Sequence, residues 1–240
     1  MTSLCIVMPA YNEAEGIVSF INEINEALSE YPRSFVVVDD RSTDATPTVL
    51  AQLANQGIPV EVHTNSQNSG HGPSTMRALK FGLESGAEIV IAVDGDGQFT
   101  GFDIARAVDK IISGPWNLIE GVRTKRTDPL YRKIPTLATR LLVWSRVQQL
   151  PADANTPLRL YQRQALSDLI SLLPSTALTP NLLMSAHSRN RNIQLLEMPV
   201  RSIPRRGSSS VGSTWGRGSL IPSKRFVRFC WDATREWLSQ

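Results

Sequence analysis

The chain has 240 residues, of which 41% are hydrophobic and 20% are charged, an ordinary composition for a globular domain. No apolar run approaches the about 18 residues that a membrane-spanning helix needs, and the first residues lack the basic and apolar regions of a secretory signal. The two cysteines, Cys5 and Cys230, lie near opposite ends and predict neither a disulfide framework nor a metal cluster. We therefore expect a cytoplasmic protein rather than a membrane-spanning or disulfide-rich secreted one.

The two halves of the chain carry opposite charge, although the net charge is only +3. Residues 1–120 contain 6 Lys and Arg against 16 Asp and Glu, whereas residues 121–240 contain 19 against 6. The basic half predicts contact with an anion, such as a phosphorylated ligand, an anionic membrane or nucleic acid. The alternative is that the two halves only neutralise each other within one fold.

Apolar runs and helical periodicities alternate along the first half. We predict strands over residues 4–8, 35–38, 60–63 and 89–93, and helices over residues 12–29, 45–56 and 74–85. Ser42 or Thr43 is the expected cap of the second helix. Continuous apolar strands separated by helices favour an α/β fold with a mostly parallel sheet covered on both faces. The less regular second half predicts a helix over residues 136–149 and an amphipathic helix from Pro222 onward.

The loop Asp94–Gln98 is the strongest chemical signal in the sequence. Asp94 and Asp96 directly follow the apolar run 89–93, and a glycine separates them. A chain that leaves a buried strand through a glycine-rich turn can direct both carboxylates to one point, which suits an oxygen-preferring divalent cation. The loop predicts a metal-assisted reaction on a phosphorylated substrate.

Two other kinds of acidic loop fit this segment less well. A calcium EF-hand that began at Asp94 would need an acid where Ala105 stands, and it would follow a helix rather than a strand. A phosphatase of the haloacid dehalogenase class has Asp-x-Asp-Gly-Thr after a strand, but Gln98 stands at the Thr position and no acidic cluster follows. The first interpretation fails, and the second is a remote competitor.

Three further loops follow predicted strands and should reach the same edge, because ligands of such sheets bind beyond the carboxyl ends of the strands. The loop Pro9–Glu13 either starts a helix or contacts a nucleoside. Asp39 and Asp40 end a buried valine run, where an acid needs a partner; they either cap a helix or accept hydrogen bonds from a base. The loop Asn68–Ser74 precedes a helix N-terminus, which favours anions, and His71 is expected to be an ordinary loop residue.

Together, these four loops resemble the family 2 inverting glycosyltransferases of GT-A fold. The segments that carry the resemblance are Pro9–Glu13, Val38–Thr46, Asn68–Gly72 and Asp94–Gln98. The chain is most similar to the branch that contains dolichol-phosphate mannose synthase and the bacterial polyprenyl-phosphate glycosyltransferases. The residues that indicate this branch are Gln98, Arg123, Arg132–Thr136, Asp153, Arg159–Tyr161 and residues 197–209, and the resemblance spans residues 3–212.

The resemblance implies a Rossmann-like GT-A fold and a metal-dependent, inverting transfer of a hexose from a GDP- or UDP-linked sugar to a polyprenyl phosphate. It implies that the nucleotide sugar contacts Pro9, Tyr11, Glu13, Asp39, Asp40, Asn68, Gly70, Asp94, Arg205 and Arg206. It assigns Mg²⁺ or Mn²⁺ to Asp94, Asp96 and Gln98, and the acceptor phosphate to Arg123, Arg132 and Thr136. The expected catalytic residues are Asp94, Asp96, Arg123, Arg132 and Asp153.

The role of Asp153 depends on the acceptor. An ionised lipid phosphate needs no general base, whereas a hydroxyl acceptor does, and Asp153 is then the main candidate. The alternative is that Asp153 is structural and pairs with Arg159 or another basic residue. Three departures from the branch touch mainly the acceptor side: Thr156–Leu158 replace Ser-Gly-Phe, Arg41 stands where Gly or Asn is usual, and the Arg205 loop is one residue short.

We expect a glycosyltransferase domain over residues 1–212, with a nucleotide-sugar half (1–120) and an acceptor half (121–212), followed by a basic, aromatic tail (213–240). The helix in this tail either packs on its own domain or binds an anionic membrane surface, which would place the protein on the inner face of a membrane. The nearest alternative function is transfer to a saccharide or other hydroxyl acceptor. A nucleic-acid-binding protein that stacks bases on Trp215, Phe226 and Trp231 is a remote alternative, and no nucleic-acid partner is expected.

Overall fold

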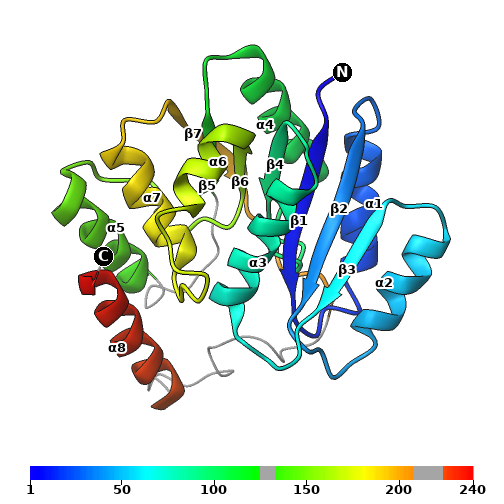
Figure 1. Cartoon of the computed structure of the whole chain (residues 1–240), viewed down its shortest axis with the longest axis horizontal. Coiled ribbons are helices and arrows are strands. Elements are labelled where there is room, and N and C mark those ends of the chain that lie inside the picture. Colours follow the sequence, from blue (N-terminus) through cyan, green and yellow to red (C-terminus); the bar gives the residue numbers. More distant parts are fainter. Residues whose placement is uncertain (125–132, 208–223, 240) are drawn as a thin grey trace.

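A seven-stranded sheet forms the centre of the computed structural model, with helices on both of its faces (Figure 1). The strand order is β3-β2-β1-β4-β6-β5-β7. The strands are β1 (Leu4–Ala10), β2 (Arg33–Asp39), β3 (Val60–Thr64), β4 (Ile89–Ala92), β5 (Leu118–Thr124), β6 (Arg159–Gln162) and β7 (Leu195–Arg201). The structure describes residues 1–124, 133–207 and 224–239, and the side chains of residues 133–136, 138 and 224–230 lie outside this description.

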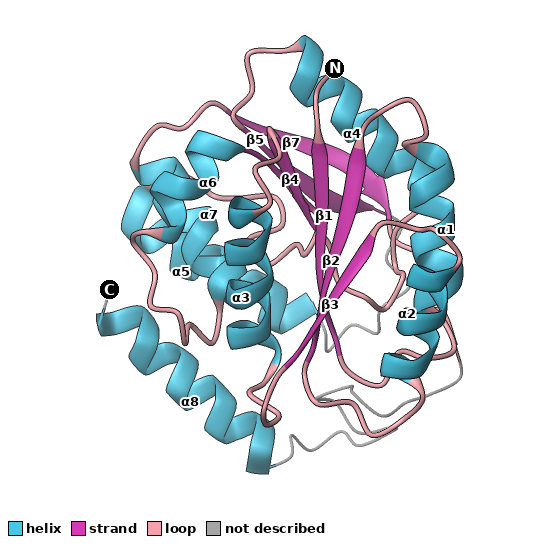
Figure 2. Cartoon of the chain, turned by 45° about the vertical axis from the view of Figure 1, so that its right-hand side comes forward, coloured by secondary structure: helices cyan, strands magenta, loops and turns pink. Residues whose placement is uncertain are grey.

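The helices form two layers, one on each face of the sheet (Figure 2). They are α1 (Ile17–Ala27), α2 (Thr46–Asn55), α3 (His71–Glu84), α4 (Gly101–Ser113), α5 (Lys133–Val147), α6 (Arg163–Ile170), α7 (Pro180–Asn190) and α8 (Lys224–Ser239). One core lies between the sheet and α1, α2 and α4, and a second core lies between the sheet and α3, α5, α6, α7 and α8. Successive residues of β1 alternate between them, since Ile6 joins the first core and Val7 the second. Burial on both faces explains why the strands are continuous apolar runs.

The first helix is shorter than its apolar periodicity predicts. Residues 12–16 precede α1 instead of belonging to it, because Asn12 has a left-handed backbone (φ 56°) and its side-chain oxygen accepts the N–H group of Thr43 at 2.8 Å. This contact joins the loop after β1 to the loop after β2. The tertiary contact thus replaces the first helical turn.

The second and third helices also begin differently from the prediction. Ala45, rather than Ser42 or Thr43, is the N-cap residue of α2 and has no side-chain cap, while Oδ1 of Asp44 accepts the N–H group of Thr46 at 2.9 Å. Helix α3 begins at His71, three residues earlier than predicted, directly after a glycine with φ 92°. Both changes occur within the loops at the carboxyl ends of the strands.

The strand register brings these loops to one edge of the sheet. Ala10, the last residue of β1, pairs with Asp39, and Asp39 pairs with Thr64 at the end of β3. Strand β5 runs in the same direction as β4, because β6 is antiparallel to both. The segment that precedes β6 and the last residues of β5 therefore reach this edge as well.

The described part of α8 packs against its own domain. Trp237 is only 3% exposed and belongs to the second core. Glu236 accepts hydrogen bonds from the N–H groups of Leu178 (2.7 Å) and Thr179 (3.1 Å). Trp215 and the side chain of Phe226 lie outside the described residues. Within the described part of the chain, no helix has both the length and the apolar character needed to cross a membrane.

Candidate active site

Backbone hydrogen bonds join the loops at the carboxyl edge of the sheet. Asp40 donates its N–H group to the carbonyl of Ala10 (2.8 Å), and Gly95 donates to the carbonyl of Pro9 (3.2 Å). Pro9 itself is buried in β1, whereas Tyr11 is half-buried at the edge. The segments that the sequence predicted to share one edge are therefore in direct contact.

The Asp94–Gln98 loop holds its acids close to a third carboxylate. Asp96 accepts the N–H group of Gln98 at 3.2 Å. Burial raises the pKa of Asp96 to about 7, and the charges of Asp94 and Glu13 contribute to this rise. Burial also raises the pKa of Glu13. The charges of Asp94 and Glu13 thus disfavour ionisation of Asp96, and a divalent cation beside Asp94 and Asp96 would offset this repulsion.

The donor set of this loop fits a hard divalent cation. Mg²⁺ is usually held by one or two carboxylates and completes its coordination with water and substrate phosphate oxygens. Asp94 and Asp96 match that description. No group of three or more His, Cys, Asp or Glu side chains in the described residues is arranged to hold a metal ion, so a bound cation would need oxygens from the substrate. The predicted contribution of Gln98 stays a prediction.

His71 lies beside the acidic loop, although the sequence predicted an ordinary loop residue. Its Nε2 is 3.5 Å from Oδ1 of Asp94, and both side chains are partly exposed. His71 is the first residue of α3, so the N-terminal end of that helix faces the acids. No sequence signal indicated this contact, because the two residues are 23 positions apart and share neither a helical or strand periodicity nor a motif.

Asp40 holds the loop that precedes α3. Its carboxylate accepts the N–H groups of Ser69 (2.7 Å) and Gly70 (2.8 Å) and the side-chain amide of Asn65 (2.8 Å). Its carbonyl accepts the side-chain amide of Asn68 (3.1 Å). The structure therefore gives Asp40 a positioning role, and its predicted contact with the nucleoside stays a prediction.

Asp39 shapes the turn that follows β2. Its carboxylate accepts the N–H group of Ser42 at 3.2 Å. Arg41, between them, has a left-handed backbone (φ 64°), which Gly and Asn adopt at less cost than a longer side chain. This conformation is the physical reason why Gly or Asn suits the position better than Arg.

Arg205 and Arg206, which come late in the sequence, contact the acidic loop and the loop that contains Glu13. Arg205 forms an ion pair with Glu13. The N–H group of Arg206 donates to the carbonyl of Asp96 (3.0 Å), and its guanidinium pairs with Glu23. Both arginines were predicted to contact the donor, and the structure brings them to the loop that carries the acids.

Arg123 and Asp153, which were predicted to lie on the acceptor side, form a two-pronged ion pair. Nε and Nη2 of Arg123 donate to the two carboxylate oxygens of Asp153 at 2.7 and 3.0 Å. Asp153 is thus paired with Arg123 rather than with Arg159. Arg132 and the side chain of Thr136 were also predicted to bind the acceptor phosphate, and they lie outside the described residues.

Arg159 is hydrogen-bonded to the segment that contains Asp153. It is fully buried, forms an ion pair with Glu120 (2.7 Å), and donates Nη2 to the carbonyl of Ala154 (3.0 Å). Arg189 binds the other oxygen of Glu120 at 2.8 Å. A buried charge destabilises the fold strongly unless an opposite charge pairs with it in this way. Glu120 and Arg189 carry no sequence motif, and only the fold revealed them.

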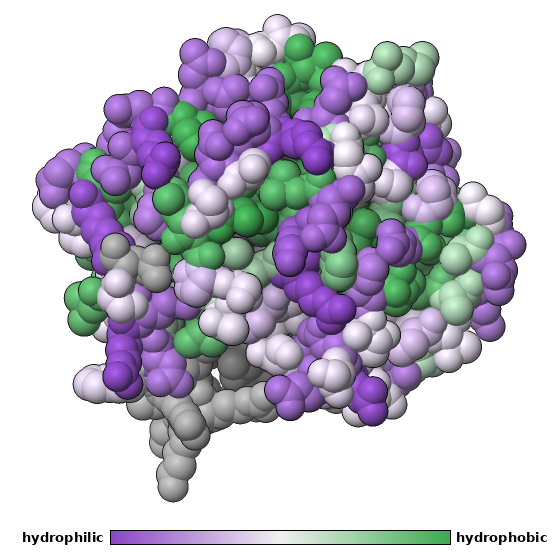
Figure 3. Space-filling view, in the orientation of Figure 1, coloured by the Kyte–Doolittle hydropathy of each residue, from purple (hydrophilic) through white to green (hydrophobic). Residues whose placement is uncertain are grey.

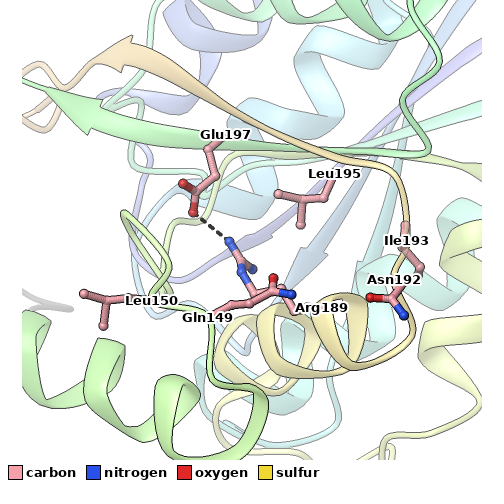
Figure 4. Close-up of a pocket in the computed structure, with 7 residues that line it drawn as sticks. All are labelled: Gln149, Leu150, Arg189, Asn192, Ile193, Leu195 and Glu197. Carbon is pink, nitrogen blue, oxygen red and sulfur yellow. Dashed lines mark hydrogen bonds and ion pairs between the residues drawn. The ribbon is translucent and has the colours of Figure 1, made fainter.

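A cavity of about 440 Å³ lies between β7, α7 and the residues after α5 (Figure 4). Arg189 and Glu197 both line it and form an ion pair with each other at 2.6 Å. The N–H group of Ala152, next to Asp153, donates to Glu197 at 2.8 Å. The cavity therefore adjoins the back of the Asp153 segment and contains none of the predicted donor residues.

Hydrophobic residues gather over α3 and α6 on the face shown in Figure 3. A second hollow of about 410 Å³ is lined by residues of these helices, among them Met76, Arg77 and Ile170. Arg77 donates to the side-chain oxygen of Asn65, which in turn bonds to Asp40. The hollow thus lies behind the loop that precedes α3 and not at the acidic loop.

Residues 5–169 match the family model described as "Glycosyl transferase family 2". The chain is 24% identical over 215 residues to a UDP-N-acetylglucosamine–dolichyl-phosphate N-acetylglucosaminyltransferase of Methanococcus voltae, which covers 82% of this chain and 84% of that protein. It is 25% identical to an undecaprenyl-phosphate 4-deoxy-4-formamido-L-arabinose transferase of Pectobacterium carotovorum over 70% of this chain. The chain spans about half (51%) of that bacterial protein.

A solved structure shares the fold. The glucosyl-3-phosphoglycerate synthase of Mycobacterium tuberculosis, in complex with Mn²⁺, UDP and glucosyl-3-phosphoglycerate, superposes with a TM-score of 0.66 at 17% identity. The match covers 87% of this chain and 73% of the mycobacterial one. This likeness confirms the predicted GT-A architecture.

Proposed function

We infer that this chain, which belongs to glycosyl transferase family 2, transfers a hexose from a GDP- or UDP-linked sugar to a polyprenyl phosphate. Relatives that are named for transfer to dolichyl and undecaprenyl phosphate support this class of acceptor. The cluster of Glu13, Asp94 and Asp96 supports the donor side, because a nucleoside diphosphate reaches such acids only together with a cation. The cation would be Mg²⁺ or Mn²⁺, and Mn²⁺ is present in the structurally similar mycobacterial enzyme.

The donor side is suited to stabilise a leaving diphosphate. Asp94 and Asp96 would hold the divalent cation, which supplies positive charge where the leaving group becomes more negative. Arg205 and Arg206 lie next to the same loop and would add charge-assisted hydrogen bonds to the diphosphate oxygens. Tyr11, Asp39 and the loop that Asp40 holds would bind the nucleoside.

The ion pair between Arg123 and Asp153 is the observation that favours a phosphate acceptor. To act as a general base, Asp153 would have to take a proton and lose the negative charge that pairs with Arg123, which would weaken its hydrogen bonds of 2.7 and 3.0 Å. A lipid phosphate is already ionised near neutral pH and needs no base. Nη2 of Arg123 also donates to the carbonyl of Asn155 at 3.4 Å, so these contacts fix the guanidinium beside the Asp153 segment, where we propose that it orients the acceptor phosphate.

The proposed reaction is a single displacement at the anomeric carbon. An oxygen of the acceptor phosphate forms a bond to C1 of the sugar while the bond from C1 to the donor diphosphate breaks. The electron pair of the broken bond leaves with the nucleoside diphosphate, and the configuration at C1 inverts. No proton needs to move, so the residues of this chain have to orient two anions and neutralise their charge.

Replacing Asp153 with Asn tests the acceptor class. We expect the wild-type chain, with Mn²⁺ and a nucleotide sugar, to glycosylate a short-chain polyprenyl phosphate and to leave the matching polyprenol unmodified. Asp153→Asn should lower that rate less than about tenfold, because no catalytic base is lost. Removal of a general base typically costs about 10²- to 10⁴-fold.

The alternatives give different results in the same assay. Transfer to the alcohol, abolished by Asp153→Asn, would favour a hydroxyl acceptor with Asp153 as its base. A chain that releases no nucleoside diphosphate from any GDP- or UDP-sugar, with or without an acceptor, would overturn the proposed function. Product formation is measured by chromatography of the lipid fraction together with nucleotide release.

A further inference from the structure

Large hydrophobic side chains are exposed mainly on one part of the molecule. Nine such side chains are strongly exposed among the described residues, and six of them lie on α5, directly after it, or on α8. These six are Leu137, Leu141, Trp144, Leu150, Trp231 and Leu238. Scattered exposed hydrophobic residues are normal on a protein surface, but a concentration of them indicates an interaction site.

On α5, the exposed residues share one side of the helix. Leu137, Leu141 and Trp144 are spaced by four and three residues, which places them one above the other. They are 51%, 48% and 46% exposed, whereas Val143 is fully buried in the core beneath α5. The helix is therefore apolar on its inner side, where the core requires it, and also on its outer side.

Helix α8 repeats this arrangement beside α5 (Figures 1 and 2). Trp231 and Leu238 are seven residues apart, hence on the same side of the helix, and they are 73% and 76% exposed. Trp237 faces inward and is 3% exposed. The guanidinium of Arg146 on α5 lies 4.3 Å from the ring centroid of Trp237 and donates a hydrogen bond to its carbonyl. The two helices are thus in contact.

The charges around these residues are mainly positive. Helix α5 contains Lys133, Arg140 and Arg146 and no acid, and α8 contains four basic residues against two acids. Of those acids, Glu236 is directed inward to the N–H groups of Leu178 and Thr179. Tryptophan and leucine among basic residues are the composition of helices that lie in the interface of an anionic bilayer.

The surface also adjoins the acceptor side of the candidate site. Arg140 on α5 donates Nε to the carbonyl of Pro151 at 2.7 Å, and Pro151 lies two residues before Asp153. An acceptor that reaches Asp153 and Arg123 would therefore approach along the end of α5. A polyprenyl phosphate is held in a bilayer, so a bilayer at α5 would bring its phosphate toward these residues.

We propose that the outer sides of α5 and α8 form a docking surface for an anionic lipid bilayer. Leu137, Leu141, Trp144, Trp231 and Leu238 enter the interface between head groups and acyl chains, and the net positive charge of the two helices attracts the anionic lipid. The inference deepens the proposed function, on which it rests, by naming the surface from which the acceptor reaches the site.

Sedimentation of the full chain with lipid vesicles tests this surface. Wild-type protein should bind vesicles of phosphatidylcholine with phosphatidylglycerol and bind pure phosphatidylcholine more weakly. Leu141→Glu combined with Trp144→Glu should lower the partition coefficient about tenfold or more, because two apolar groups leave the interface and two negative charges enter it. The matched control is Phe102→Glu combined with Ile112→Glu on α4, whose side chains are 71% and 42% exposed, and it should bind like the wild type.

Other outcomes would overturn the proposal. Equal vesicle binding by the α5 variant and the wild type would overturn it, as would a wild-type chain that does not bind anionic vesicles. A lipid-free dimer that the α5 variant dissociates, with no vesicle binding, would assign the surface to a second copy of the chain. Circular dichroism and the melting temperature show whether each variant is folded.

The same variants separate this proposal from the proposed function. With a water-soluble, short-chain polyprenyl phosphate, the α5 variant should keep the wild-type rate, because its substitutions touch no residue of the candidate site. With acceptor embedded in anionic vesicles, its rate should fall in parallel with its binding. A chain that binds vesicles but transfers no sugar to either acceptor would contradict the proposed function and leave the docking surface supported.

Discussion

The carboxylates of the donor side and those of the acceptor side have different surroundings. On the donor side, Glu13, Asp94 and Asp96 lie close together, and the pKa of Asp96 rises to about 7. On the acceptor side, Asp153 and Glu120 are each bound by an arginine at 2.7 Å. The charge of Asp94 disfavours ionisation of Asp96, which favours cation binding there, and among the described residues only Glu13 of these three acids is paired with an arginine, Arg205. Asp153 and Glu120 instead both hold arginines in place. The difference supports the proposed cation at Asp94 and Asp96 and the proposed role of Arg123 toward the acceptor.

The largest effect should come from removing a donor-side acid. Asp96→Ala takes away one of two carboxylates that would hold the cation, so we expect kcat/KM for sugar transfer to fall about 10³-fold. Nucleotide release with Mn²⁺ measures this loss. Asp109→Ala, an acid on α4 that bonds to Tyr31, is the matched control and should change the rate little. If the Asp96→Ala enzyme were as active as the control, Asp96 would have no role in cation binding, and the acids of the donor side would not differ in function from those of the acceptor side.

The next effect concerns stability on the acceptor side. Glu120→Gln leaves the buried guanidinium groups of Arg159 and Arg189 without their shared counter-charge, so the free energy of unfolding should fall by about 3–5 kcal/mol. Urea denaturation followed by circular dichroism measures it. Glu84→Gln, which breaks the surface pair with Lys80 at 3.9 Å, should cost far less. Equal losses for the two variants would show that Glu120 is not a structural acid.

The smallest effect is the pH dependence of stability that Asp96 causes. Because its pKa in the folded chain lies above the unfolded value, folding takes up a proton, and this contribution to stability is lost as the pH rises from about 4 toward 7. In metal-free buffer, Asp96→Asn should therefore stabilise the chain at pH 8, by about 1–2 kcal/mol after allowance for solvent screening, and have little effect at pH 4. A thermal melt at both values measures the difference.

Divalent cation should reverse the sign of this result. Added Mn²⁺ should raise the melting temperature of the wild type at pH 8 and leave that of Asp96→Asn nearly unchanged, because a ligand stabilises only the state that binds it. Asp109→Asn is the control for a surface acid and should behave like the wild type. A wild type that Mn²⁺ fails to stabilise, even with a nucleoside diphosphate present, would contradict the predicted cation site.

Much of the fold was predictable because local patterns carry it. The bounds of the apolar runs that became β1, β2, β3 and β4 were predicted to within two residues, since burial on both faces requires continuous hydrophobic residues. The starts of the helices were less predictable. Asn12 and Asp44 bond across two loops, and this contact, which no helical periodicity contains, decides where α1 and α2 begin.

The candidate site likewise has features that the sequence predicts and features that it does not. Its acidic loop and its place at the sheet edge follow from residues that are adjacent in the chain, and so did the likeness to the family that the comparisons confirm. The pairing of its charges does not follow from the chain order. Asp153 was expected to act as a base or to pair with Arg159 or another basic residue, and only the fold shows that its partner is Arg123.

By itself, the sequence determined the alternating elements, the four polar loops at the ends of the strands and the acids of the Asp94–Gln98 loop. Each of these depends on a hydrophobic period or on neighbours in the chain. Only the tertiary structure decided that Arg205 pairs with Glu13 across 192 positions, that Glu120 joins Arg159 to Arg189, and that α5 leaves an apolar side exposed. Such contacts depend on which segments the closed fold brings together, and no local pattern of residues records that.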